Sequence, residues 1–327
     1  MRPHVFEDRA LHGRSHGTVE ACRDLNGVCC RCGDFDDAAL GSAYILDTTI
    51  STPEEQSMKR FAILAATLGA VFATFAATSV AAGALPTLTL ALTKNTVTVG
   101  GAKVSGAVNI VSTVSGEASD GPGLILLKPG VTPQEFGKAV SHFGPNSPFD
   151  AIDPYGTIVF DGSAVQGSAT SAQAVLVPGT YIAVNNGNGF TPFTVTASAH
   201  PASLPKPAAT VSTIDFGFRG ASTLRDGELV RFKNDGYLIH MFADAQVASV
   251  ATAKKVEALL LAGKMKQAKK YVVAPPSPFA GPLSSGSMQQ EVITQPPGVY
   301  VILCLMNTED GREHFQLGMF KTIKIVK

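Results

Sequence analysis

PGVYVILCLMNTEDGREHFQLGMFKTIKIVK, residues 297–327, is the stretch on which the interpretation of this chain depends. The apolar run that ends in Cys304 predicts a strand in which Tyr300, Ile302 and Cys304 share one face. The alternating residues 320–326 predict a last strand. Together they predict a β-protein in which one strand delivers a cysteine sulfur to the end of an apolar interior.

The loop between these two strands carries further candidate ligands. His314 follows Cys304 after nine residues, and Met319 lies five residues beyond His314. Asp310-Gly311 is typical of a turn, so we expect the loop to fold back. Sulfur, imidazole and thioether groups should then lie close together.

Cys304 is the single cysteine after Met58, and we expect His240 in the middle of a strand over the apolar segment YLIHMF, residues 237–242. A lone cysteine in an exported protein cannot form an internal disulfide, so it is an inert core residue, a reactive thiol or a metal ligand. A histidine among apolar neighbours is costly to bury without a partner. Each of the four residues has an ordinary core or loop interpretation when it is taken alone.

The C-terminal segment resembles the cupredoxin (plastocyanin- and azurin-like blue copper) family. PGVYVILC followed by H-x4-M is similar to the end of a cupredoxin, and VRFKNDGYLIH is similar to the segment that carries the first ligand histidine. The resemblance implies one type 1 copper ion, with His240 and His314 as nitrogen ligands, Cys304 as thiolate and Met319 as axial ligand. Zinc is the weaker interpretation, because methionine is a poor zinc ligand.

Two features depart from the family pattern. The nine residues between Cys304 and His314 exceed the loop of typical electron-shuttle cupredoxins and are closer to that of copper nitrite reductases. His240 is followed by Met241, where many cupredoxins have asparagine.

An internal duplication predicts two tandem Greek-key β-sandwiches, each with a short inserted helix. SDGPGLILL, VTPQEFGKAVSHF and PGTYIAV in the first copy have counterparts in NDGYLIHMF, a helix-like stretch over 250–270 and PGVYVIL. The first copy offers Ile125 or Leu126 opposite His240 and holds no ligand set. We expect an upstream extension, spurious or disordered, over 1–57, a signal peptide over 58–84, a metal-free domain over 85–199, a Pro-rich linker over 200–210 and a copper-binding domain over 211–327.

The segment MKRFAILAATLGAVFATFAATSVAAGALP, residues 58–86, has the basic start, apolar run and small-residue cleavage patterns of a signal peptide. It predicts an extracytoplasmic protein, periplasmic or secreted, without stable membrane insertion. The alternative is a membrane anchor through residues 61–82. The four cysteines before residue 58 do not form two separate C-x2-C pairs, which disfavours a zinc site.

Composition narrows the function. Charged residues make up 16% of the chain and glycine and proline are frequent, which favours an all-β fold. The net charge is zero, with no basic stripe for nucleic acid. We expect an exported one-electron carrier rather than an enzyme, docking a redox partner at an exposed edge of His314 beside Phe315 and Leu317. The alternative is a non-catalytic β-sandwich for binding or copper sequestration. The sequence leaves the oligomeric state open.

Overall fold

The computed structural model describes residues 84–115, 121–142, 149–163, 165–185, 189–274 and 278–327. Strands dominate these ranges, which confirms the predicted all-β fold. The proposed extension over 1–57 and all of the proposed signal peptide except Ala84 lie outside the described residues. Within the described ranges, no helix has the length and apolar character needed to cross a bilayer.

The first half of the described chain is a two-layered sandwich. Its strands are β1 (Thr87–Leu92), β2 (Val97–Gly101), β3 (Gly106–Val114), β4 (Pro122–Leu127), β5 (Gly156–Asp161), β6 (Ala169–Leu176), β7 (Gly179–Asn185) and β8 (Gly189–Val195). One layer has the order β2-β1-β3-β6 and the other β5-β4-β7-β8. Leu88, Leu90 and Leu92 alternate with exposed residues along β1 and pack into the core between the layers.

The second half is built in the same way. Its strands are β9 (Ala209–Ile214), β10 (Gly217–Gly220), β11 (Thr223–Arg225), β12 (Leu229–Asn234), β13 (His240–Val247), β14 (Ala280–Leu283), β15 (Met288–Val292), β16 (Gly298–Leu303) and β17 (Phe320–Val326). One layer has the order β10-β9-β12-β15 and the other β14-β13-β16-β17-β11. A separate apolar cluster fills the space between these layers.

The strand order of the first half therefore recurs in the second. In both halves the first strand pairs in parallel with a strand beyond the first hairpin, β1 with β3 and β9 with β12. The equivalent tyrosines also repeat a contact, since the hydroxyl of Tyr181 donates to the Val177 carbonyl and that of Tyr300 to the Pro296 carbonyl. These shared details support the predicted duplication.

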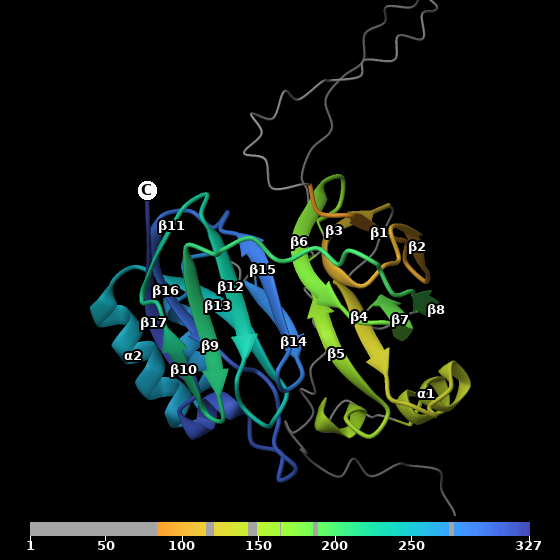
Figure 1. Cartoon of the computed structure of the whole chain (residues 1–327). Coiled ribbons are helices and arrows are strands. Elements are labelled where there is room, and N and C mark those ends of the chain that lie inside the picture. Colours follow the sequence, from red (N-terminus) through yellow and green to blue (C-terminus); the bar gives the residue numbers. More distant parts are fainter. Residues whose placement is uncertain (1–83, 116–120, 143–148, 164, 186–188, 275–277) are drawn as a thin grey trace, which may run out of the picture. The chain divides into compact units, whose positions relative to one another are not determined.

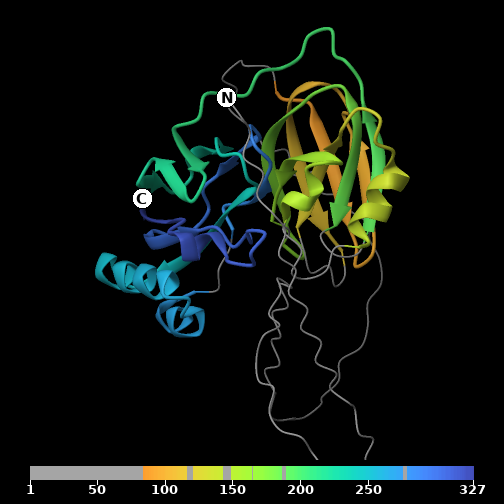
Figure 2. The same cartoon turned by 90° about the horizontal axis from the view of Figure 1, so that it is seen from below.

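The two halves are joined through one sheet. Strand β6 pairs with β15, with Ala174 opposite Gln289 and Ala172 opposite Glu291, so eight strands form a continuous layer (Figure 1). The chain between β8 and β9 crosses from one half to the other without regular structure (Figure 2). The domain limits 85–199, 200–210 and 211–327 stay a prediction.

Helices follow β4 in the first half and β13 in the second, as the sequence predicts. They are α1 (Pro133–Val140) with η1 (Phe149–Ile152), and α2 (Val250–Leu261) with α3 (Met265–Ala268) and η2 (Lys269–Tyr271). Thr132 caps α1 in a capping box with Glu135, and Ser249 caps α2. Val256 and Leu260 of α2 pack into a third apolar cluster, which draws on both halves and contains Cys304.

Candidate metal centre

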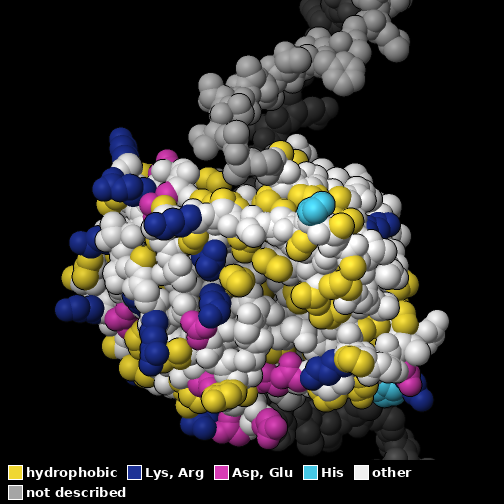
Figure 3. Space-filling view, in the orientation of Figure 1, with side chains coloured by type: hydrophobic (Ala, Val, Ile, Leu, Met, Phe, Trp, Pro, Cys, Tyr) yellow, Lys and Arg dark blue, Asp and Glu magenta, His cyan; other side chains and the backbone are white. Residues whose placement is uncertain are grey.

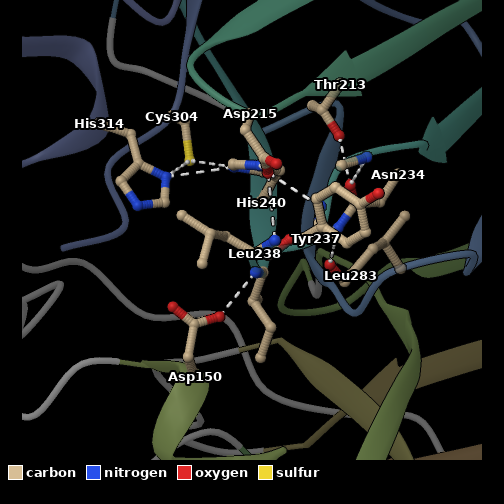
Figure 4. Close-up of polar contacts among 12 residues, drawn as sticks. Asp150, Thr213, Asp215, Asn234, Tyr237, Leu238, His240, Leu283, Cys304 and His314 are labelled. Atoms are coloured by element: carbon tan, nitrogen blue, oxygen red, sulfur yellow. Dashed lines mark hydrogen bonds and ion pairs between the residues drawn. The ribbon is translucent and has the colours of Figure 1, made fainter. Parts of the chain in front are cut away.

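The structure brings three of the four predicted ligands together. His240 begins β13, Cys304 follows the last residue of β16, and His314 begins the short helix η3 (His314–Leu317). The Cys304 Sγ lies 3.4 Å from His314 Nδ1 and 3.8 Å from His240 Nδ1, and the two Nδ1 atoms are 3.1 Å apart (Figure 4). All three side chains are fully buried. Two nitrogens and a sulfur therefore converge on one point inside the protein.

Backbone hydrogen bonds bring Met319, the fourth predicted ligand, beside this cluster. The Cys304 N–H donates to the Met319 carbonyl, and the Met319 N–H donates to the His314 carbonyl. Met319 is fully buried in the same apolar cluster as Cys304. This placement is compatible with an axial thioether. The assignment of all four residues as ligands stays a prediction.

The loop between Cys304 and His314 folds back at the predicted turn. Gly311 has a φ of 81° and donates its N–H to the Thr308 carbonyl. The His314 N–H then donates to the Met306 carbonyl, which fixes the histidine beside the end of β16. Gly318, with a φ of 94°, ends η3 in the left-handed conformation that glycine favours.

Two local expectations need correction. Cys304 packs in the cluster of Val301 and Leu303, whereas Tyr300 and Ile302 pack in the inter-sheet core of the second half. The predicted alternation fails at Cys304 because β16 ends at Leu303, so the cysteine lies beyond the regular strand. His240 likewise lies at the start of its strand and not in the middle.

Asp215, which follows β9, also belongs to the centre, and the sequence analysis did not predict it. Its Oδ1 accepts from the backbone N–H groups of Tyr237 and Leu238 and lies 3.1 Å from His240 Nε2. Burial opposes its ionisation, but the hydrogen bonds from Leu238, His240 and Tyr237 outweigh it and hold the pKa of Asp215 below its ordinary value. An ionised Asp215 accepts hydrogen bonds only, so Nε2 is the protonated nitrogen of His240.

This contact leaves the Nδ1 lone pair of His240 directed at Cys304 and His314. Burial lowers the pKa of His240 despite the opposing Asp215 carboxylate, so the imidazole is neutral. A carboxylate behind a ligand histidine fixes its tautomer in many metal sites. The donor set therefore fits a metal cation that prefers nitrogen and sulfur ligands.

Gly236 makes this approach possible. A β-carbon on Gly236 would lie 2.6 Å from Asp215 Oδ1 and 2.9 Å from His240 Nε2. Any larger residue would push the carboxylate and the imidazole apart, so the glycine in the segment NDG serves the centre as well as the turn.

The two remaining donors are neutral when no cation is present. Burial raises the pKa of the Cys304 thiol to about 12, and the N–H groups of Met241 and Met306 only partly offset this. Burial and the neighbouring His240 lower the pKa of His314 to about 4. A metal ion that binds here therefore displaces the thiol proton, and metal binding is coupled to proton release.

The prediction that His314 has an exposed edge is wrong. His314 and Phe315 are fully buried, and His314 Nε2 has no hydrogen-bond partner among the described residues. Phe216 packs edge-on against the His314 ring, with the ring centroids 5.3 Å apart. It does so with a φ of 60°, a conformation that costs energy for a residue other than glycine.

Two further residues hold the segment that precedes His240. Asn234 accepts from the Gly236 N–H and donates to the carbonyls of Leu238 and Leu283. Asp150, from the first half, accepts from the Ile239 N–H (Figure 4). The turn-forming NDG sequence signals the first of these contacts. No local pattern signals Asp150 or Asp215, because both act across long sequence separations.

The first half lacks a counterpart of this centre within its described residues. Leu126 pairs with Tyr181 as Gln246 pairs with the equivalent Tyr300, so Leu126 falls at the position of Gln246. In the same register Asn185 falls at the position of Cys304. The expectation that Ile125 or Leu126 stands opposite His240 is therefore wrong, because the shared register moves that counterpart into residues 116–120, outside the described ranges. His142 and His200 are exposed.

Comparisons with known proteins find no matching protein-family model and no matching curated protein. Auracyanin from Roseiflexus castenholzii is 18% identical, covering 36% of this chain and 95% of its own length, at a TM-score of 0.23. Auracyanin A, a "blue" copper protein from Chloroflexus aurantiacus, is 20% identical, covering 36% of this chain and 96% of its own, at 0.21. A copper-containing nitrite reductase from Thermus scotoductus is 11% identical, covering 74% of this chain and 61% of its own, at 0.20. Scores this low carry no functional argument.

Proposed function

We propose that the second half binds one copper ion through His240, Cys304 and His314, with Met319 as the axial ligand, and that the protein carries single electrons. The observation that supports this most strongly is the convergence of Cys304 Sγ with two imidazole nitrogens in a fully buried cluster. Asp215 adds to it by fixing the tautomer of His240. Two imidazoles, a thiolate and a weak thioether form the ligand set of type 1 copper.

When bound, copper supplies a change of one electron between its two oxidation states. The residues of this chain keep the ligand positions fixed during that change. His240 is held by Asp215, His314 by its backbone contact to Met306, and Cys304 by the N–H of Met241. A fixed ligand set reduces the rearrangement that accompanies electron transfer.

Electrons would reach the surface through the groups that cover the centre. Phe216 contacts the His314 ring and is 37% exposed, and the Asp215 side chain, which contacts His240, is 29% exposed. Tyr237, bonded through its backbone to Asp215, is 87% exposed. We place the contact with a redox partner protein at these residues, because they replace the exposed histidine edge expected from the sequence.

Three further aspects of function are inferred. On the face shown in Figure 3 basic and acidic side chains are intermixed, which supports the prediction that nucleic acid is not a partner. We infer an electron carrier rather than an enzyme, because the ligand set of the proposed site is that of type 1 copper. We place the protein outside the cytoplasm, on the signal-peptide pattern of residues 58–84.

The visible spectrum of the purified protein with added Cu(II) tests the copper site. The wild-type protein should show an intense copper–thiolate band that Cys304→Ser abolishes and His142→Ala leaves unchanged, since His142 is exposed and distant in sequence from the cluster. A wild-type protein that retains no copper after desalting would rule out the site.

Copper sequestration is the second candidate, and the burial of His314 favours it. A fully covered ligand slows electron exchange with a partner but does not prevent metal binding. Electron exchange with a small-molecule oxidant separates the two functions. A carrier reoxidises within the time of a stopped-flow experiment, whereas a sequestering protein keeps its copper reduced.

A further inference from the structure

The hydrogen bond between Asp150 and Ile239 crosses from the metal-free half to the centre. Asp150 lies in η1 of the first half, and its Oδ1 accepts from the Ile239 N–H at 2.7 Å. Ile239 is fully buried and directly precedes His240. A buried N–H group without an acceptor is costly, so this carboxylate is needed where the chain enters β13.

All four backbone N–H groups from Gly236 to Ile239 donate to side-chain acceptors. The Gly236 N–H donates to Asn234, those of Tyr237 and Leu238 donate to Asp215, and that of Ile239 donates to Asp150. Asn234 and Asp215 belong to the second half, and Asp150 is the acceptor that the first half supplies. The position of His240 therefore depends on both halves.

We propose that Asp150 is a positioning residue through which the first half completes the metal centre, by holding Ile239 and with it His240. This inference rests on the proposed copper-binding function. It gives the metal-free half a role that its own lack of ligands does not suggest.

Hydrogen exchange in the metal-free protein tests the positioning contact without copper. Asp150→Ala removes the acceptor, and the Ile239 amide should exchange roughly 10-fold faster or more, because hydrogen bonds to charged groups are among the stronger ones. Asp150→Asn keeps an acceptor oxygen and should exchange close to the wild-type rate. Asp153→Ala is the matched control, since Asp153 lies three residues away and contacts Asp150 through its backbone.

Unchanged exchange at Ile239 in Asp150→Ala overturns the positioning role. If the wild-type protein takes up no copper, the proposed function fails, while the exchange rates still decide the positioning contact.

Discussion

The two halves of this protein share a fold and differ at the position where metal chemistry would occur. At the end of β16 stands Cys304, next to two imidazoles, and at the equivalent position of β7 stands Asn185. Asn185 is buried and donates to the Thr93 carbonyl, so the first half satisfies its polar group with its own backbone. The comparison teaches that the same sandwich forms with and without a ligand set, so that metal chemistry would depend on a few side chains placed at its end.

The largest expected effect comes from removing a ligand. His240→Ala and His314→Ala should each weaken copper binding by more than about 100-fold, which exceeds the roughly 10–100-fold cost of losing an outer partner. His200→Ala, at an exposed histidine, should leave the affinity unchanged. Equilibrium competition with a Cu(II) chelator measures the copper affinity. Equal affinities for all three variants would contradict the assignment of His240 and His314 as ligands.

The next effect tests whether the surroundings of the ligands matter. Asp215→Ala should weaken copper binding by about 10–100-fold, because the tautomer and orientation of His240 are no longer fixed. Asp235→Ala is the control, since that carboxylate pairs with Lys233 and not with the imidazole. The same chelator competition measures both variants. Wild-type affinity in Asp215→Ala would contradict the proposed role of this residue.

A pH effect is expected where the halves join. Glu291 of β15 is half-buried at the seam with β6, and burial, with the nearby Asp161 charge, raises its pKa from 4.5 to about 8. The folded protein keeps this proton up to about pH 8, whereas the unfolded chain releases it near pH 4.5. The free energy of unfolding should therefore fall as the pH rises through this window and stay level above it.

Urea unfolding at several pH values measures this effect. Glu291→Gln carries no titrating group and should lose that part of the pH dependence. A control variant, Glu228→Gln, changes a carboxylate in the turn before β12 and should keep it. If the free energy of unfolding depends on pH equally in wild type and Glu291→Gln, the Glu291 carboxyl does not titrate as predicted.

The smallest effects compare the repeated tyrosines. Tyr181 both donates to the Val177 carbonyl and accepts from the Val177 N–H, whereas Tyr300 donates to Pro296, which has no N–H. Tyr300→Phe should cost about 0.5–1.5 kcal/mol, the usual value of one hydrogen bond, and Tyr181→Phe should cost more. Denaturant unfolding measures both. A larger cost for Tyr300→Phe than for Tyr181→Phe would contradict the inference that the second hydrogen bond of Tyr181 adds stability.

The sequence predicted those features that local patterns encode. The last strand over 320–326, the turn at Asp310-Gly311 and the helix after β13 all occur as expected, because they depend on neighbouring residues. The repeat of features along the chain also predicted the repeated strand order. The proximity of His240, Cys304 and His314 followed from the family resemblance, and the structure does bring these side chains together.

Contacts between distant segments could not be predicted in this way. Asp150 and Asp215 lie 89 and 25 residues from the groups that they hold, and neither stands in a recognisable motif. The cover of Phe216 over His314 depends on one left-handed residue after β9. An exposed histidine edge was expected because the sequence cannot show which hairpin folds over a ligand.

The coordination of copper in the loaded protein tests the central claim most directly. X-ray absorption spectroscopy of the Cu(II) form should show one short copper–sulfur bond and two imidazole nitrogens, and Cys304→Ser should lose the sulfur. Copper bound by nitrogen and oxygen alone in the wild-type protein would contradict the account, because the Cys304 side chain would then take no part in the site.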